Sequence, residues 1–175
     1  MNIPNTLTVV RILLTPLFVA FVAYDNIMAA AIVFALAGIT DALDGFIAKM
    51  FSQTTKFGAN MDPVADKFLL VSAFIALGLK GIVPLWLMVL VILRDITILS
   101  GVLVLRLSGR SVNISPTFSG KITTVLQIAV IMAALLTAGA MSLVIEGISF
   151  ITAAFTLYSG IVYILREVGN QERAR

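Results

Sequence analysis

The sequence contains no cysteine and no histidine among its 175 residues. The absence of cysteine excludes disulfides and thiol catalysis, and the absence of histidine excludes imidazole metal ligands and every Ser-His-Asp triad. Charged residues are also scarce, at 12%, whereas a soluble domain typically contains about 25%. Any acid–base or metal chemistry must therefore use the nine carboxylates, with lysine and arginine as helpers.

Hydrophobic residues are what the chain has in excess, at 60% of the sequence with a mean hydropathy of +1.09. A chain of this size cannot bury so many apolar side chains and still present a polar surface. We therefore expect an all-α integral membrane protein with one domain over residues 1–175. The net charge of +3 favours anionic lipid heads or phosphorylated substrates as partners, and not nucleic acid.

The apolar residues fall into segments long enough to cross a membrane, for which a helix needs about 20 apolar residues. The pattern predicts six transmembrane helices, at Asn5–Tyr24, Ile27–Phe51, Asp62–Leu79, Val83–Leu107, Gly120–Ala138 and Met141–Leu165. The two longer links, Ser52–Met61 and Ser108–Ser119, are rich in small polar and basic residues. The other links are very short, which favours antiparallel neighbours.

Basic residues predict the orientation of these spans. They gather at the two termini and around the two longer links, whereas the remaining links contain only Lys80. The positive-inside rule then places both termini and both longer links in the cytoplasm of a multi-pass cell-membrane (inner-membrane) protein. The apolar run after Arg11 also resembles a signal peptide, but no clear A-x-A cleavage site follows it.

Ionisable residues inside spans are costly, so each one suggests a function. Six such residues that fall within the predicted spans or at their ends are Asp41, Asp44, Asp62, Asp66, Arg94 and Asp95. The first pair has i, i+3 spacing and the second has i, i+4 spacing, so each pair shares one helix face. Two antiparallel neighbouring helices can bring all four carboxylates together, where cations must offset their repulsion. Oxygen ligands fit Mg²⁺ or Mn²⁺, and two such ions suit displacement at phosphorus. The alternative is that these aspartates cap helices or pair with nearby lysines.

The spacing of these aspartates carries a resemblance. The run from Asp41 to Asp66 resembles the signature D-x2-D-G-x2-A-R-x8-G-x3-D-x3-D of the CDP-alcohol phosphotransferases, matching seven of its eight fixed positions. Lys49 stands where the family usually has arginine, which keeps the charge and loses the bidentate fork. Three further segments are similar to those of family branches that make phosphatidylglycerophosphate or cardiolipin. They are the opening P-N-x-L-T-x-x-R, the run Asp62–Lys67 and the run Gly120–Gln127.

The resemblance implies a six-span homodimer that transfers a phosphatidyl group from CDP-diacylglycerol to an alcohol and releases CMP on the cytoplasmic side. It implies that Asp66 is both metal ligand and general base. It also implies two sets of binding residues: Asp41, Asp44, Asp62 and Asp66 for the metal, and Asn5, Thr8, Gly45, Ala48, Lys49 and Gly58 for the CDP group.

The acceptor alcohol is the part that the signature leaves open. Glycerol 3-phosphate is our first expectation, and phosphatidylglycerol, as in the cardiolipin synthases, is the alternative. Arg94 and Lys121 are candidates for holding an acceptor phosphate. Arg94 also needs a partner, either Asp95 or one of the four site carboxylates. A structural ion pair is the alternative role for Arg94, and an interfacial anchor is the alternative role for Lys121. An ion-coupled transporter and a non-catalytic membrane scaffold remain as rival functions.

Overall fold

The structure is a computed structural model of the chain. It describes the backbone of residues 3–51, 56–107, 118–137 and 143–173. Side chains are described for residues 9–40, 65–101, 118–137, 143–163 and 165. Within these ranges the chain is helical and contains no β-strand, which agrees with the all-α expectation.

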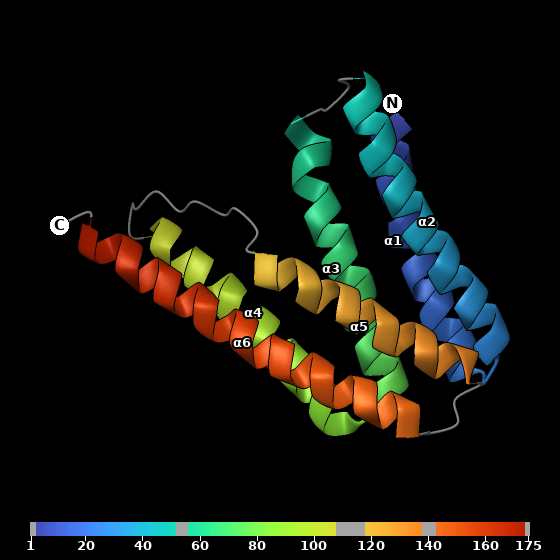
Figure 1. Ribbon diagram of the computed structural model, residues 1–175. Helices are drawn as coiled ribbons and strands as arrows, with labels where there is room; N and C mark the ends of the chain where they lie inside the picture. The colour runs from blue at the N-terminus through green and yellow to red at the C-terminus, as the bar shows by residue number, and fades with distance from the viewer. Residues whose placement is uncertain (1–2, 52–55, 108–117, 138–142, 174–175) are drawn as a thin grey trace.

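Six helices follow one another along the chain (Figure 1). They are α1 (Ile3–Ala23), α2 (Ile27–Phe51), α3 (Lys56–Leu79), α4 (Leu85–Leu107), α5 (Phe118–Leu136) and α6 (Leu143–Arg173). Two differ clearly from the expected spans. The α3 helix begins at Lys56 instead of Asp62, and α6 continues to Arg173 instead of ending at Leu165. Backbone hydrogen bonding does not stop where apolar residues stop, and the lysine, arginine and glutamate residues there are good helix formers.

Two of these helices, within the described residues, are long and apolar enough to cross a membrane: Phe118–Leu136 and Leu143–Tyr163. Shorter apolar stretches run through Val9–Ala23 and Ile27–Thr40. The six-span arrangement and its orientation therefore stay predictions for the other helices.

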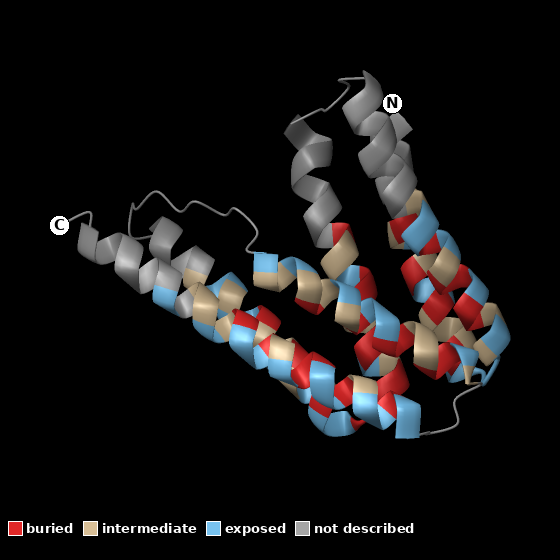
Figure 2. Cartoon of the chain, in the orientation of Figure 1, coloured by how far each residue is buried: buried red, intermediate tan, exposed pale blue. Residues whose placement is uncertain are grey.

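The helices form two groups, α1–α3 and α4–α6, which meet at α5 and where α3 contacts α4. The α1 helix packs against α2 and α3, while α6 packs against α4 and α5, and α5 also contacts α2 and α3. Figure 1 shows α4 and α6 side by side, inclined to α1 and α2. Buried residues lie on the facing sides of the helices, and exposed apolar residues lie on the outside (Figure 2). The outer apolar residues suit contact with lipid tails.

The α1–α2 and α3–α4 connections end the preceding helices by the same device. Asp25 after α1 and Gly81 after α3 have positive φ values of 59° and 72°. In each case the next backbone N–H bonds back to the helix, Asn26 to the Phe21 carbonyl at 2.9 Å and Ile82 to the Leu77 carbonyl at 2.9 Å. This Schellman pattern satisfies carbonyls that the helix end would otherwise leave free.

These two turns are also joined to each other. The Lys80 Nζ donates to the Ala23 carbonyl at 2.9 Å and to the Asp25 Oδ1 at 2.7 Å. The end of α1 and the end of α3 therefore lie together. The predicted site aspartates of α3, Asp62 and Asp66, lie toward its opposite, N-terminal half.

Candidate active site at Asp66 and the charged pairs beside it

Asp66 of α3 forms an ion pair with Arg11 of α1. The Arg11 side chain is 1% exposed, whereas the Asp66 side chain is 42% exposed. A buried guanidinium requires a partner of opposite charge, because desolvating an uncompensated charge is very costly. Arg11 is therefore an internal partner of the predicted general base, and not a charge on the protein surface.

Both residues line a cavity of about 90 Å³ at the junction of α1, α2, α3 and α5. Its remaining lining residues are Phe34, Ala37, Gly38, Leu69, Leu70, Thr124 and Ile128. Ala37 and Gly38 are one turn before Asp41 on α2, so the cavity adjoins the part of α2 that carries the acidic pair. The exposed carboxylate of Asp66 can thus meet a small polar ligand or a cation there.

A second set of charges lies next to the first along α3. The Lys67 Nζ donates to both carboxylate oxygens of Asp95 in α4, at 2.8 and 2.7 Å. The Arg94 Nη1 donates to the same Asp95 at 2.7 Å, and its Nη2 donates to the Ser159 hydroxyl of α6 at 2.7 Å. We refer to Lys67, Arg94, Asp95 and Ser159 as the charged network.

The charged network answers the question of which group pairs with Arg94. Its partner is Asp95, the neighbour in sequence, and not Asp66, the one site carboxylate whose side chain the structure describes. Two cations share one carboxylate here, so these side chains carry one positive charge in excess. This excess keeps Arg94 a candidate for binding a phosphate.

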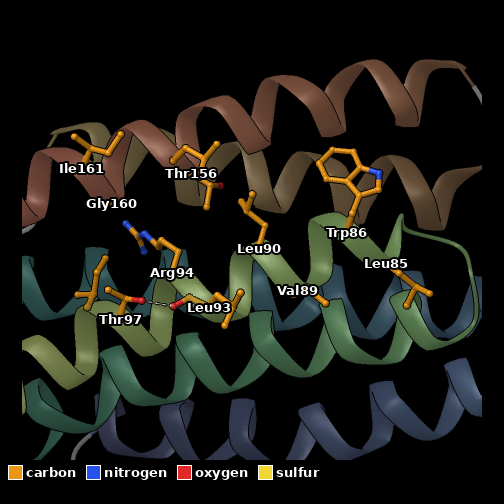
Figure 3. Close-up of a pocket in the computed structure, with 12 residues that line it drawn as sticks. Leu85, Trp86, Val89, Leu90, Leu93, Arg94, Thr97, Thr156, Gly160 and Ile161 are labelled. Carbon is orange, nitrogen blue, oxygen red and sulfur yellow. Dashed lines mark hydrogen bonds between the residues drawn. The ribbon is translucent and has the colours of Figure 1, made fainter.

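Arg94 also borders an apolar groove of about 660 Å³ between α4 and α6 (Figure 3). Leu85, Trp86, Val89, Leu90 and Leu93 line it from α4, and Thr156, Leu157, Gly160 and Ile161 line it from α6. Arg94 is the only charged residue among the residues lining this groove. The groove can accommodate an alkyl chain beside a single cationic group.

Most other predicted site residues are placed by backbone alone. The side chains of these residues lie outside the described ones. The residues are Asn5 and Thr8 of α1, Asp41, Asp44, Gly45, Ala48 and Lys49 of α2, and Gly58 and Asp62 of α3. Among described side chains, no three carboxylates come together as metal ligands. Lys121 lies at the beginning of α5 and is exposed.

The one described member of the predicted metal set fits that role. Asp66 offers hard oxygen donors, its side chain is 42% exposed, and it lines a cavity beside α2. Carboxylate oxygens are the ligands that Mg²⁺ and Mn²⁺ prefer.

Sequence reasoning missed three partners in this region. It predicted neither the pairing of Arg11 with Asp66 nor that of Lys67 with Asp95, and it passed over Ser159 as a partner of Arg94. Arg11 and Lys67 were detectable as charges inside apolar segments. Their partners are not adjacent in sequence, so only the packing of the helices shows the pairs.

Comparison with known proteins identifies the family. The family model for CDP-alcohol phosphatidyltransferases matches residues 1–162 of this chain. The chain belongs to the CDP-alcohol phosphatidyltransferase family. It is accordingly a membrane-associated transferase of phospholipid synthesis, and the transporter and scaffold alternatives are disfavoured.

Three relatives illustrate the range of this family. The chain is 33% identical to a probable phosphatidylglycerophosphate synthase of Mycobacterium tuberculosis, over 97% of this chain and 84% of that protein. It is 49% identical to a CDP-diacylglycerol–glycerol-3-phosphate 3-phosphatidyltransferase of Pseudomonas fluorescens, over 44% of this chain and 41% of that protein. It is 32% identical to the cardiolipin synthase (CMP-forming) of Rattus norvegicus, over 77% of this chain and 50% of that protein. CDP-alcohol phosphatidyltransferases similar to this chain thus include both acceptor types.

Proposed function

We propose that this transferase moves the phosphatidyl group of CDP-diacylglycerol to glycerol 3-phosphate, producing phosphatidylglycerophosphate and CMP. The observation that carries the proposal is the half-exposed carboxylate of Asp66, held by the buried Arg11 at the wall of a cavity. The phosphatidylglycerophosphate synthase relative aligned over 97% of this chain supports glycerol 3-phosphate as the acceptor.

In this mechanism Asp66 acts on the acceptor. A free hydroxyl is a poor nucleophile, and a positioned carboxylate assists it by taking its proton. The hydroxyl oxygen forms a bond to the phosphatidyl phosphorus, the bond from that phosphorus to the bridging oxygen breaks, and CMP leaves with that oxygen. Arg11 fixes the direction of the Asp66 carboxylate through its ion pair from α1.

The metal proposal concerns the four aspartates. Asp41 and Asp44 of α2 and Asp62 and Asp66 of α3 would hold two divalent ions, Mg²⁺ or Mn²⁺. Such ions, when bound, neutralise the charge that develops on the leaving CMP. Around them, Asn5, Thr8, Gly45, Ala48, Lys49 and Gly58 would bind the CDP group.

Acceptor binding is assigned to Arg94 and Lys121. Arg94 belongs to a network with one excess positive charge that begins at Lys67, the residue after Asp66. Lys121 is exposed at the beginning of α5, where it can approach a soluble phosphate.

Phosphatidylglycerol is the second candidate acceptor, and the apolar groove beside Arg94 favours it. A lipid acceptor requires room for an acyl chain next to the cation that binds its phosphate. The groove between α4 and α6 supplies both features.

The wider arrangement is also part of the proposal. We propose six membrane spans, a homodimer, both termini in the cytoplasm, and an active site on the cytoplasmic side of the cell membrane. The basic residues around the two longer links and the termini support the orientation.

The test is CMP release by the purified full-length protein with CDP-diacylglycerol in mixed micelles. Glycerol 3-phosphate and phosphatidylglycerol are offered in separate reactions, each with Mg²⁺, with Mn²⁺, or with EDTA. Release with glycerol 3-phosphate, lost with EDTA, is the expected result. Release with phosphatidylglycerol alone would replace the first acceptor by the second.

An Asp66→Asn variant separates the base from the remainder of the site. Its turnover should fall to the background level, while binding of a CDP-containing ligand, measured by titration calorimetry, should persist. Turnover equal to that of the wild type would remove Asp66 from the role of general base.

A further inference from the structure

Asp95 is the centre of the charged network, and no step of the proposed reaction uses it. Its side chain is 7% exposed and accepts hydrogen bonds from Lys67 and Arg94. Arg94 continues the network to Ser159, so one carboxylate connects α3, α4 and α6. A group this deeply buried between two cations needs an explanation, because a buried carboxylate is costly unless its partners are well placed.

The position of Lys67 on α3 suggests the explanation. Consecutive residues of an α-helix point about 100° apart around its axis. Asp66 therefore reaches Arg11 of α1, while Lys67 reaches Asp95 of α4. Two ion pairs made by adjacent residues to two different helices resist rotation of α3 about its axis in either direction.

The packing of α3 leaves its rotation dependent on these ion pairs. Along its length α3 packs mainly against α1, with fewer contacts to α4 and α5. The Asp66 side chain is itself 42% exposed, so apolar packing does not enclose it. The direction of its carboxylate depends on the rotation of α3, and hence on the pair that Lys67 makes.

We propose that Asp95 is a positioning residue that holds α3 through Lys67 and thereby sets the position of Asp66 for proton abstraction. The proposal rests on the proposed role of Asp66 as general base. Arg94 and Ser159 serve the same restraint by holding the Asp95 carboxylate from the α6 side.

The test compares Asp95→Asn with the wild type in steady-state CMP release. A misplacement of about 1 Å can cost roughly 100-fold in rate, so we expect kcat to fall by about 10- to 100-fold. The KM for CDP-diacylglycerol should stay within about twofold, because the donor site is not assigned to this network. The Lys67→Gln variant should show the same pattern, and Lys67→Arg, which keeps the charge, should restore most of the turnover.

A double variant tests whether the two residues act through one contact. If Asp95 acts on Asp66 through Lys67, Lys67→Gln/Asp95→Asn should be no slower than the slower single variant. If instead the fold-losses in kcat of the two single variants multiply in the double variant, the two residues act independently and the proposal is overturned.

The matched control is Asp25→Asn. Asp25 pairs with Lys80 at 2.7 Å, just beyond the far end of α3, so the substitution also breaks an ion pair involving a residue beside α3. Asparagine tolerates the positive φ of position 25. This variant should keep the kcat of the wild type.

Several results would overturn the proposal. One is a wild-type kcat for Asp95→Asn with only a lower thermal midpoint, which would make the network merely structural. Another is a raised KM for the acceptor with unchanged kcat, which would make the network a binding site. If Asp95→Asn does not fold, Lys67→Gln and Lys67→Arg decide the question by the same criteria.

The Asp66→Asn variant separates this proposal from the proposed function. Wild-type turnover in Asp66→Asn would remove the role of Asp66 and this proposal with it. Loss of turnover in Asp66→Asn, together with unchanged turnover in Asp95→Asn, would remove this proposal alone.

Discussion

Two charged residues, Arg11 and Asp95, are buried among the described side chains. Each is placed against opposite charge, Arg11 against Asp66, and Asp95 against Lys67 and Arg94. Buried pairs of this kind contribute little net stability, because desolvation offsets most of the attraction. On our proposal, these pairs instead fix the direction of the exposed carboxylate of Asp66.

Arg11→Gln should therefore lower turnover far more than it lowers stability. Without the guanidinium, the Asp66 carboxylate loses its restraint from α1, and we expect CMP release to fall by about 10-fold or more. The loss of stability should stay below the roughly 3–5 kcal/mol measured for broken, fully buried pairs, because water can solvate the exposed Asp66. Arg11→Lys keeps one charged donor group, and its rate of CMP release should lie between those of the wild type and Arg11→Gln. Unchanged CMP release by Arg11→Gln would show that Asp66 needs no partner from α1.

At the scale of helices, the close approach of α3 to α4 depends on a glycine. A Cβ added at Gly78 would lie 2.6 Å from the Met88 sulfur and 3.1 Å from the Met88 Cβ. Gly147 of α6 offers a contrast, since an added Cβ there meets nothing within 4 Å. Glycine at position 78 thus serves the packing of α3 on α4, the same pair of helices that Lys67 and Asp95 join.

Gly78→Ala and Gly147→Ala should have opposite effects on stability. Alanine in a helix is favoured over glycine by about 1 kcal/mol, and Gly147→Ala should gain up to that amount. Gly78→Ala must displace Met88, and overpacking costs about 1–3 kcal/mol, so it should be the less stable variant. Thermal unfolding in detergent, followed by circular dichroism, measures both. Equal midpoints would mean that Met88 moves aside at no cost.

At the scale of the whole molecule, the ends of α1, α2 and α3 fall into two sets. In Figure 1, α1 begins, α2 ends and α3 begins at one end of the molecule, and the short α1–α2 turn lies at the opposite end. Lys80 ties the α3–α4 turn to the α1–α2 turn. This arrangement agrees with alternating helix directions, as the positive-inside pattern requires.

Single cysteines can test the orientation, because the natural chain has none. Tyr24 near the α1–α2 turn is 85% exposed, and Phe118 at the beginning of α5 is 79% exposed. With cytoplasmic termini, a membrane-impermeant maleimide should label Tyr24→Cys in intact cells and label Phe118→Cys only after permeabilisation. The reverse labelling pattern would show that the topology is the opposite of the proposed one. CMP release by each variant serves as the control that it is folded.

The sequence by itself determined the class of the protein and its family. Long apolar segments dictate helices in a membrane, because lipid cannot satisfy backbone polar groups. The spacing of Asp41, Asp44, Asp62 and Asp66 within those segments was specific enough to indicate the transferase family that the family model then matched. The helix boundaries were less predictable, since α3 begins six residues before the expected Asp62 and α6 continues beyond Leu165.

Only the tertiary structure decided which charges meet. Arg11 and Asp66 are 55 positions apart, and Lys67 and Asp95 are 28 apart, so no local spacing rule connects them. Arg94 and Asp95 are neighbours whose side chains leave a helix in different directions, yet the Asp95 carboxylate accepts hydrogen bonds from both Arg94 and Lys67. A buried charge pairs with whichever group of opposite charge helix packing brings within reach. Which group that is depends on how each helix is rotated about its axis and shifted along it, and a sequence pattern does not contain this information.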